Sequence, residues 1–113
     1  MAEITFFDAS SVCCFGNVRP PYFALHNQLI RAAVSVPANV AEGAGRTGDR
    51  DFRRFVRIAL GSASELEYHL LLARDLGLIP VHPYARLSAA VVEVKRMLSG
   101  LAASLTTESR AEV

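Results

Sequence analysis

Arginines crowd into one short stretch of the chain. Five of them fall within twelve residues, namely Arg46, Arg50, Arg53, Arg54 and Arg57. Positions 46, 50, 53 and 57 are four, three and four residues apart, so they share one face if a helix runs through them. Planar guanidinium groups suit phosphate oxygens, which they contact through paired hydrogen bonds. The stretch predicts a nucleic-acid-binding stripe, a contact for a partner protein, or a solvated face with intrahelical ion pairs.

A second group of polar residues falls close to apolar helical positions. Gly61 and Ser62 fall in the middle of a helical pattern, where glycine costs about 1 kcal/mol relative to alanine, and such small residues would let another helix come close. The neighbouring polar side chains are predicted to form one structural hydrogen-bond network, made of Asn39, Glu42, Ser62 and Glu65. A polar catalytic pocket is the alternative for the same residues.

Residue patterns typical of catalysis or metal binding are not apparent. Glu65 and His69 are four residues apart, whereas a di-iron bundle needs Glu-x-x-His on two helices, and no second copy exists. Residues 43–46 lack the preceding strand and the Gly-Lys-Ser/Thr ending of a phosphate loop. We therefore expect a protein that is not an enzyme and that uses no metal or cofactor.

Three long helices are predicted to position these residues. Apolar residues spaced three and four apart run through residues 22–44, where the ring of Pro37 removes a backbone donor and is expected to kink the helix. A heptad-like seam covers residues 49–77, with Gly77 at the position of a C′ glycine, and a third seam covers residues 83–105. Short connections favour antiparallel packing, so the predicted fold class is an all-α, antiparallel up-and-down helical bundle.

The remaining segments flank this bundle. Residues 1–20 show no sustained period and include Cys13 and Cys14, which are adjacent and are expected to be reduced thiols. Residues 106–113 form a polar tail that is expected to fray. A length of 113 residues fits a single domain, with the helical bundle at residues 21–105.

Composition limits the partners of the protein. With 51% hydrophobic and 20% charged residues, the chain has globular composition. The formal net charge of +1 creates no global attraction to nucleic acid or to anionic membranes, so any electrostatic function must come from the placement of charges. No apolar run is long enough for a transmembrane helix, and the N-terminus lacks a basic signal-peptide region. We expect a cytoplasmic protein without membrane contact.

Several segments of the chain match one protein family. They are QLIRAAVSVPANVAEG at residues 28–43, Gly45-Arg46, DFRRF at residues 51–55, GSASELEY at residues 61–68 and ARDLG at residues 73–77. In this order they strongly resemble the bacterial four-helix-bundle family, whose members are also called 23S rRNA-intervening sequence proteins. The resemblance runs from about Tyr22 to Leu105, and the run SVPANVAEG is highly specific.

The resemblance implies an up-and-down bundle that assembles into a ring, with a pentamer as the first expectation. It also implies kinship with the accessory protein of diversity-generating retroelements, a basic ring that works with a reverse transcriptase on nucleic acid. Members lie within insertions in large-subunit ribosomal RNA genes or stand alone, and their molecular role is poorly defined.

The N-terminus departs from the family pattern. Members carry a first amphipathic helix, with a Trp or Tyr near its start, before the proline that precedes Tyr22, and residues 1–19 do not supply it. Three helices leave an open apolar groove, which a monomer tolerates poorly. We expect residues 4–15 or another chain to fill this groove, and we expect a homo-oligomer.

Two classes of function fit these residues. The first is a non-catalytic, oligomeric scaffold associated with RNA or DNA, linked to ribosomal RNA or to a reverse transcriptase. In this class the arginines contact phosphates, and base stacking is not predicted because no aromatic residues are interleaved in the way that single-strand binding requires. The second class is a protein–protein interaction module without nucleic acid. Salt-sensitive retention on heparin or RNA separates the two.

Overall fold

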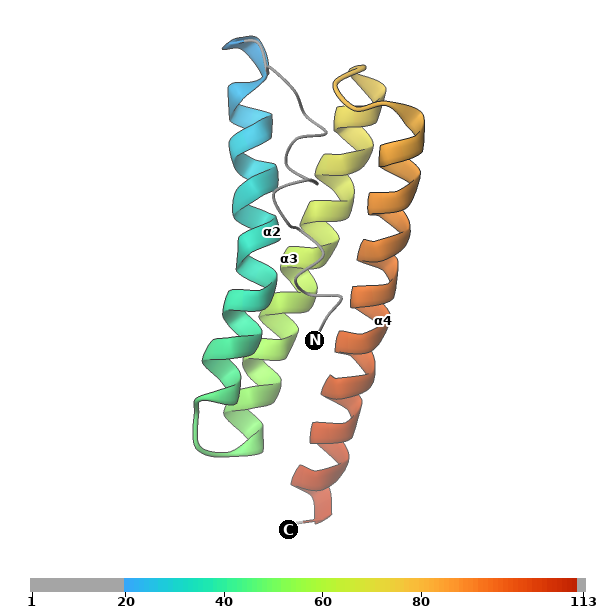
Figure 1. The fold of residues 1–113 in the computed structure, drawn as a ribbon. Coiled ribbons are helices and arrows are strands. Elements are labelled where there is room, and N and C mark those ends of the chain that lie inside the picture. Colours follow the sequence, from blue (N-terminus) through green and yellow to red (C-terminus); the bar gives the residue numbers. More distant parts are fainter. Residues whose placement is uncertain (1–19, 112–113) are drawn as a thin grey trace.

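The protein is built from α-helices throughout the part that the structure describes. The computed structural model describes the backbone of residues 20–111 and the side chains of residues 21–105. A 3-10 turn, η3 (Pro20–Tyr22), leads into α2 (Phe23–Ala44), which is followed by α3 (Asp49–Asp75) and α4 (Val81–Ala111). Consecutive helices run antiparallel and side by side (Figure 1). No strand occurs between residues 20 and 111, so the predicted all-α class is confirmed for this part of the chain.

Helix α3 ends in a Schellman motif, two hydrogen bonds that close a helix around a left-handed residue. Gly77 has a φ of 73°, and its amide donates to the carbonyl oxygen of Arg74 at 3.0 Å. The amide of Leu78 donates to the carbonyl oxygen of Ala73 at 2.9 Å. Gly77 therefore occupies the predicted C′ position. The helix itself ends at Asp75, and Leu76 is its C-cap, whose amide still donates to the carbonyl oxygen of Leu72 at 3.0 Å.

Helix α4 begins earlier than predicted. It starts at Val81, which places Pro83 third in the helix rather than first. Amides in the first helical turn have no intrahelical acceptor, so a proline there sacrifices no hydrogen bond. The ladder begins with the amide of Tyr84, which donates to the carbonyl oxygen of Pro80 at 3.0 Å.

The other helix ends also differ slightly from the predicted ones. Helix α2 starts at Phe23, because Tyr22 belongs to the 3-10 turn. Helix α4 extends to Ala111, so the helix includes most of the segment predicted as a polar tail. Helix α2 is continuous through Pro37, and the kink at that residue stays a prediction. The predictions for residues 1–19, including Cys13 and Cys14 and the filling of a groove by residues 4–15, lie outside the described residues.

Helix α3 is the centre of the bundle. Helices α2 and α4 each pack along α3 and make little direct contact with each other. The core uses the predicted stripe positions of all three helices, since steps of three and four return to the same helix face. Its largest fully buried side chains are Leu29, Val56, Leu66, Leu70, Leu87 and Val91.

One glycine permits the close approach of α2 to α3. Gly43 is buried, and a Cβ atom there would lie 2.7 Å from Cβ of Phe55 and 3.0 Å from Cδ1 of Phe52. Within the described residues of one subunit no helix approaches Gly61 closely: Gly61 is exposed, and a Cβ atom there would meet nothing within 4 Å. The reason is helix phase, because Gly61 projects away from the buried seam that Ala59 and Ala63 share.

We expect Gly43→Ala to destabilise the protein although alanine favours helix. Overpacking against Phe55 and Phe52 should lower the free energy of unfolding by about 1–3 kcal/mol in urea denaturation. The matched control is Gly100→Ala, which adds a methyl group to an exposed helical glycine with nothing within 4 Å. The control should gain about 0.5–1 kcal/mol. Equal gains in both variants would contradict a tight contact at Gly43.

Candidate functional site

The arginine-rich stretch lies at the end of the molecule where α2 turns into α3. Gly48 has a φ of 104° and is the N-cap of α3. Four arginines therefore lie on the first turns of α3, at positions 50, 53, 54 and 57. Arg46 lies in the turn, outside the helix, so the predicted single helical face does not extend through Arg46. The correction follows from Gly48, whose left-handed backbone separates the two segments.

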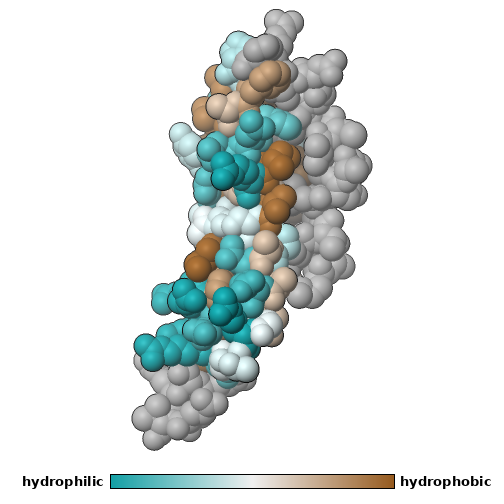
Figure 2. All heavy atoms as spheres, turned by 90° about the vertical axis from the view of Figure 1, so that its left-hand side faces the viewer, coloured by the Kyte–Doolittle hydropathy of each residue, from teal (hydrophilic) through white to brown (hydrophobic). Residues whose placement is uncertain are grey.

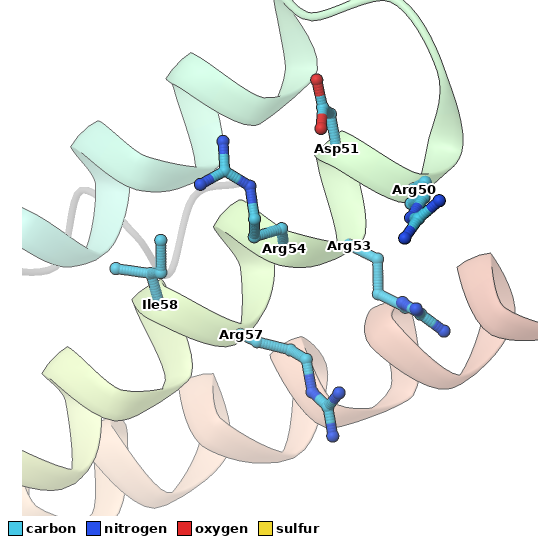
Figure 3. A pocket seen from close by; sticks show the side chains of 6 residues that line it. All are labelled: Arg50, Asp51, Arg53, Arg54, Arg57 and Ile58. Carbon is cyan, nitrogen blue, oxygen red and sulfur yellow. The ribbon is translucent and has the colours of Figure 1, made fainter.

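The four helical arginines surround a shallow hollow of about 440 Å³ (Figure 3). Its lining consists of Arg50, Asp51, Arg53, Arg54, Arg57 and Ile58. Arg54 leans toward the α2 side of α3, and Arg53 and Arg57 lean toward the α4 side (Figure 3). Guanidinium groups thus approach the hollow from several directions. We call the four arginines of this hollow the basic cluster.

The turn residue Arg46 is held beside the cluster by two contacts. Its Nε and Nη2 atoms donate to Oε1 of Glu42 at 3.2 and 2.7 Å. Its guanidinium also lies 5.3 Å from the ring centroid of Phe55, and that of Arg54 lies 4.7 Å from the same centroid. A cation over an aromatic face is attracted by the ring quadrupole. Phe55 therefore holds two arginines at the same end of the bundle.

The basic cluster carries more positive charge than its surroundings neutralise. Within the described part of the chain, Arg50, Arg54 and Arg57 form no ion pair. Asp51 is the single carboxylate in the lining of the hollow. The unpaired amides of the first turn of α3 add partial positive charge to the same end. Figure 2 shows hydrophilic side chains over the lower part of the view, the end at which Figure 1 places the α2–α3 turn.

The predicted polar network forms only in part. The Oγ atoms of Ser35 and Ser62 are hydrogen-bonded at 2.8 Å and join α2 to α3. The Nδ2 atom of Asn39 donates to Oγ of Ser35 at 2.9 Å and to its carbonyl oxygen at 2.8 Å. Sequence reasoning missed Ser35, although its position four residues before Asn39 on one helix face was a usable signal. The contacts of this trio lie within α2 and between α2 and α3, so they hold these two helices together.

The two glutamates predicted for this network do not join it. Glu42 pairs with Arg46, and Oε1 of Glu65 lies 3.1 Å from Nε2 of His69. Both glutamate side chains are about half exposed, at 53% and 52%. Helix phase turns them toward solvent, where carboxylates keep their hydration. Glu65 does border a polar hollow of about 480 Å³ between α2 and α3, together with Ser35 and Ser62.

The described part of the chain offers few other kinds of site. In residues 20–111 no group of three or more His, Cys, Asp or Glu side chains is placed to hold a metal ion. No helix in that span has the length and apolar character needed to cross a membrane. Glu65 and His69 form a pair one helical turn apart, in which the carboxylate is 52% exposed and the imidazole 14% exposed.

Fold and site together define an antiparallel helical bundle with a basic cluster at one end. The family model described as 23S rRNA-intervening sequence protein matches residues 20–100. The chain belongs to this family, which confirms the resemblance seen in the sequence. No curated protein matches the chain.

A solved structure supports the same fold. It is a protein with unknown function from the S23 ribosomal protein family of Bacteroides thetaiotaomicron VPI-5482. The two chains share a TM-score of 0.80 and 23% sequence identity, over 89% of this chain and 95% of that chain. At this identity the likeness shows the fold alone.

We expect Ser35→Ala to weaken the contact between α2 and α3. The variant removes one partner from both Ser62 and Asn39, which should lower the free energy of unfolding by about 1 kcal/mol in urea denaturation. Adding Ser62→Ala should cost less than the sum of the two single changes, because the partners share one hydrogen bond. The control is Ser64→Ala, an exposed position on α3 with the same change in helix propensity. An equal effect in the control would show that the hydroxyl pair contributes nothing.

Proposed function

We propose that this protein is a non-catalytic, nucleic-acid-associated scaffold whose basic cluster binds RNA phosphates. The observation that carries the proposal is the set of four arginines around one hollow, three of which form no ion pair within the described residues. Arginine forks match the geometry of phosphate oxygens. The link of the family to ribosomal RNA, given in its description, supports RNA as the nucleic acid.

The proposed binding depends on the phosphate backbone and tolerates any base sequence. The hollow contains no aromatic side chain on which a base can stack. Affinity should therefore come from the release of counterions and should fall steeply with salt. This fits a protein with a formal net charge of only +1, because the positive charge is concentrated at one end.

Self-association is part of the proposal. A single cluster of four arginines is a weak site. When several copies lie on one assembly, a long RNA bound at one cluster meets the remaining clusters at a high effective concentration. The resemblance to the retroelement accessory protein favours a homo-oligomeric ring, with a pentamer first, and suggests a reverse transcriptase as a partner. DNA is an alternative ligand, since the phosphate contacts are shared.

A second candidate function is a protein–protein interaction module without nucleic acid. The observation that favours it is the exposure of individual large apolar side chains outside the basic cluster. Tyr68 is 60% exposed, Val81 is 71% exposed and Val92 is 52% exposed. Exposed apolar groups can serve as contacts for other proteins.

The test is RNA retention by a variant with Arg50→Gln and Arg53→Gln. We expect weaker binding at low salt and a slope of log K against log salt that is smaller by about 1 to 2. The matched control is Arg74→Gln with Arg96→Gln, which removes the same charge from arginines that pair with Asp75 and Glu93 elsewhere on the molecule.

Three outcomes separate the candidates. Loss of binding in the first variant and retention in the control supports the basic cluster as the site. Equal binding by parent and first variant, or equal losses in both variants, overturns that assignment. Absence of RNA binding by the parent at low salt overturns the nucleic-acid proposal and leaves the interaction module.

A further inference from the structure

The outer face of α3, opposite its buried seam, is exposed along the middle of the helix. The buried residues of α3 are Val56, Ala59, Ala63, Leu66, Leu70 and Ala73. On the opposite side, the helical period brings five exposed residues together, namely Arg54, Arg57, Gly61, Glu65 and Tyr68. The apolar side chain of Ile58, 43% exposed, borders this set. Neither α2 nor α4 covers this face.

Gly61 lies at the centre of the outer face, and nothing in the described part of the subunit requires a glycine there. Its backbone φ is helical, and an added Cβ atom would meet nothing within 4 Å. A glycine inside a helix costs about 1 kcal/mol relative to alanine. At Gly43 a close contact with α3 offsets this cost, whereas Gly61 makes no such contact with the residues that the structure describes. A close approach by another helix would give Gly61 the same role.

Charge along α3 is divided at Gly61. The half before it contains four arginines and two aspartates, for a net charge of +2. The half after it contains two glutamates, one aspartate and one arginine, for a net charge of −2. Two such helices attract each other when they run antiparallel, because each positive half then faces a negative half. A parallel pair would place like charges together.

We propose that the outer face of α3 binds the same face of a second copy of this chain, with the two helices antiparallel and crossing at Gly61. We infer a second copy as the binding partner because the charge pattern of α3 is self-complementary. With Gly61 on a two-fold axis, Arg57 comes opposite Glu65 of the second copy. Arg54 comes opposite Tyr68 of the second copy, whose ring is 60% exposed and available to a guanidinium. Each contact occurs twice, as two-fold symmetry requires.

This contact goes beyond the proposed function and differs from a ring interface. A two-fold contact uses one surface twice, whereas a ring joins two different surfaces of each copy. Arg50 lies eleven residues before Gly61 on α3, about 16 Å along the helix axis. The two-fold pair therefore leaves part of each basic cluster uncovered, at opposite ends of the crossing. Because the contact is limited to a few helical turns, we expect a weak dimerisation, of single subunits or of whole rings, that salt dissociates.

The first test is sedimentation of the full chain without nucleic acid, at low salt and over a range of concentrations. We expect Gly61→Leu to raise the dissociation constant of the dimer by about tenfold or more, because the larger side chain separates the crossing helices. Gly100→Leu is the matched control, since it places the same side chain at another exposed helical glycine with open space around it. The control should leave the dissociation constant unchanged, and circular dichroism should show the same helicity for both.

The second test exchanges charges across the proposed contact. Arg57→Glu and Glu65→Arg should each weaken the dimer by about tenfold, and the double variant should recover most of the loss because the pair is restored with reversed signs. These two positions are eight residues apart, so they do not contact each other within one helix. Recovery in the double variant therefore reports a contact between copies.

Several results would overturn the proposal. A parent that shows no salt-sensitive dimerisation of its subunits or rings overturns it, as does an oligomer whose size and stability ignore both Gly61→Leu and Arg57→Glu. The proposal is also overturned if the losses of affinity in the two single charge variants add up in the double variant, without recovery. Because these measurements contain no RNA, their failure is separate from that of the proposed function, which is measured by RNA retention of the Arg50→Gln, Arg53→Gln variant.

Discussion

The bundle depends on one continuous apolar seam along α3. Helices α2 and α4 both bury their stripes against this seam, and they make little contact with each other. Small residues such as Ala59 and Ala63 keep the seam narrow. Gly43, which has no Cβ atom, lets α2 pack closely against the phenylalanines of α3. Burial of apolar surface supplies the main driving force. The position of every polar group on α3 follows from which side this seam faces.

The seam explains why charge accumulates at one end without cost to the core. Once Val56 and Ala59 point inward, the arginines between and before them are turned to solvent. Gly48 ends the turn and starts α3 two residues before Arg50, so the basic cluster begins where backbone amides are also unpaired. Phe55 bridges the two parts, because its ring accepts a guanidinium from the turn and another from the helix. A local turn geometry thus concentrates charge in a nearly neutral chain.

Polar contacts between the helices adjust the packing of the bundle, which apolar burial establishes. The hydroxyl pair between Ser35 and Ser62 fixes the relative position of α2 and α3, since apolar packing alone tolerates small shifts. Lys95 on α4 reaches Glu67 on α3 at 3.1 Å and makes a comparable contact on the other flank. Both contacts are partly exposed, so each adds modest stability. Their main effect is to define how the two outer helices lie against the central one.

The sequence alone determined the helices, their buried faces, the C′ position of Gly77 and the family. These features arise from local periodicity and from backbone preferences, which short segments carry by themselves. Tertiary structure alone decided which polar groups meet. Sequence reasoning grouped Glu42 and Glu65 with Ser62 and assigned a close helix approach to Gly61, whereas the structure turns both glutamates and Gly61 to solvent. A polar contact depends on helix phase and on the relative position of two helices, and no single segment contains that information.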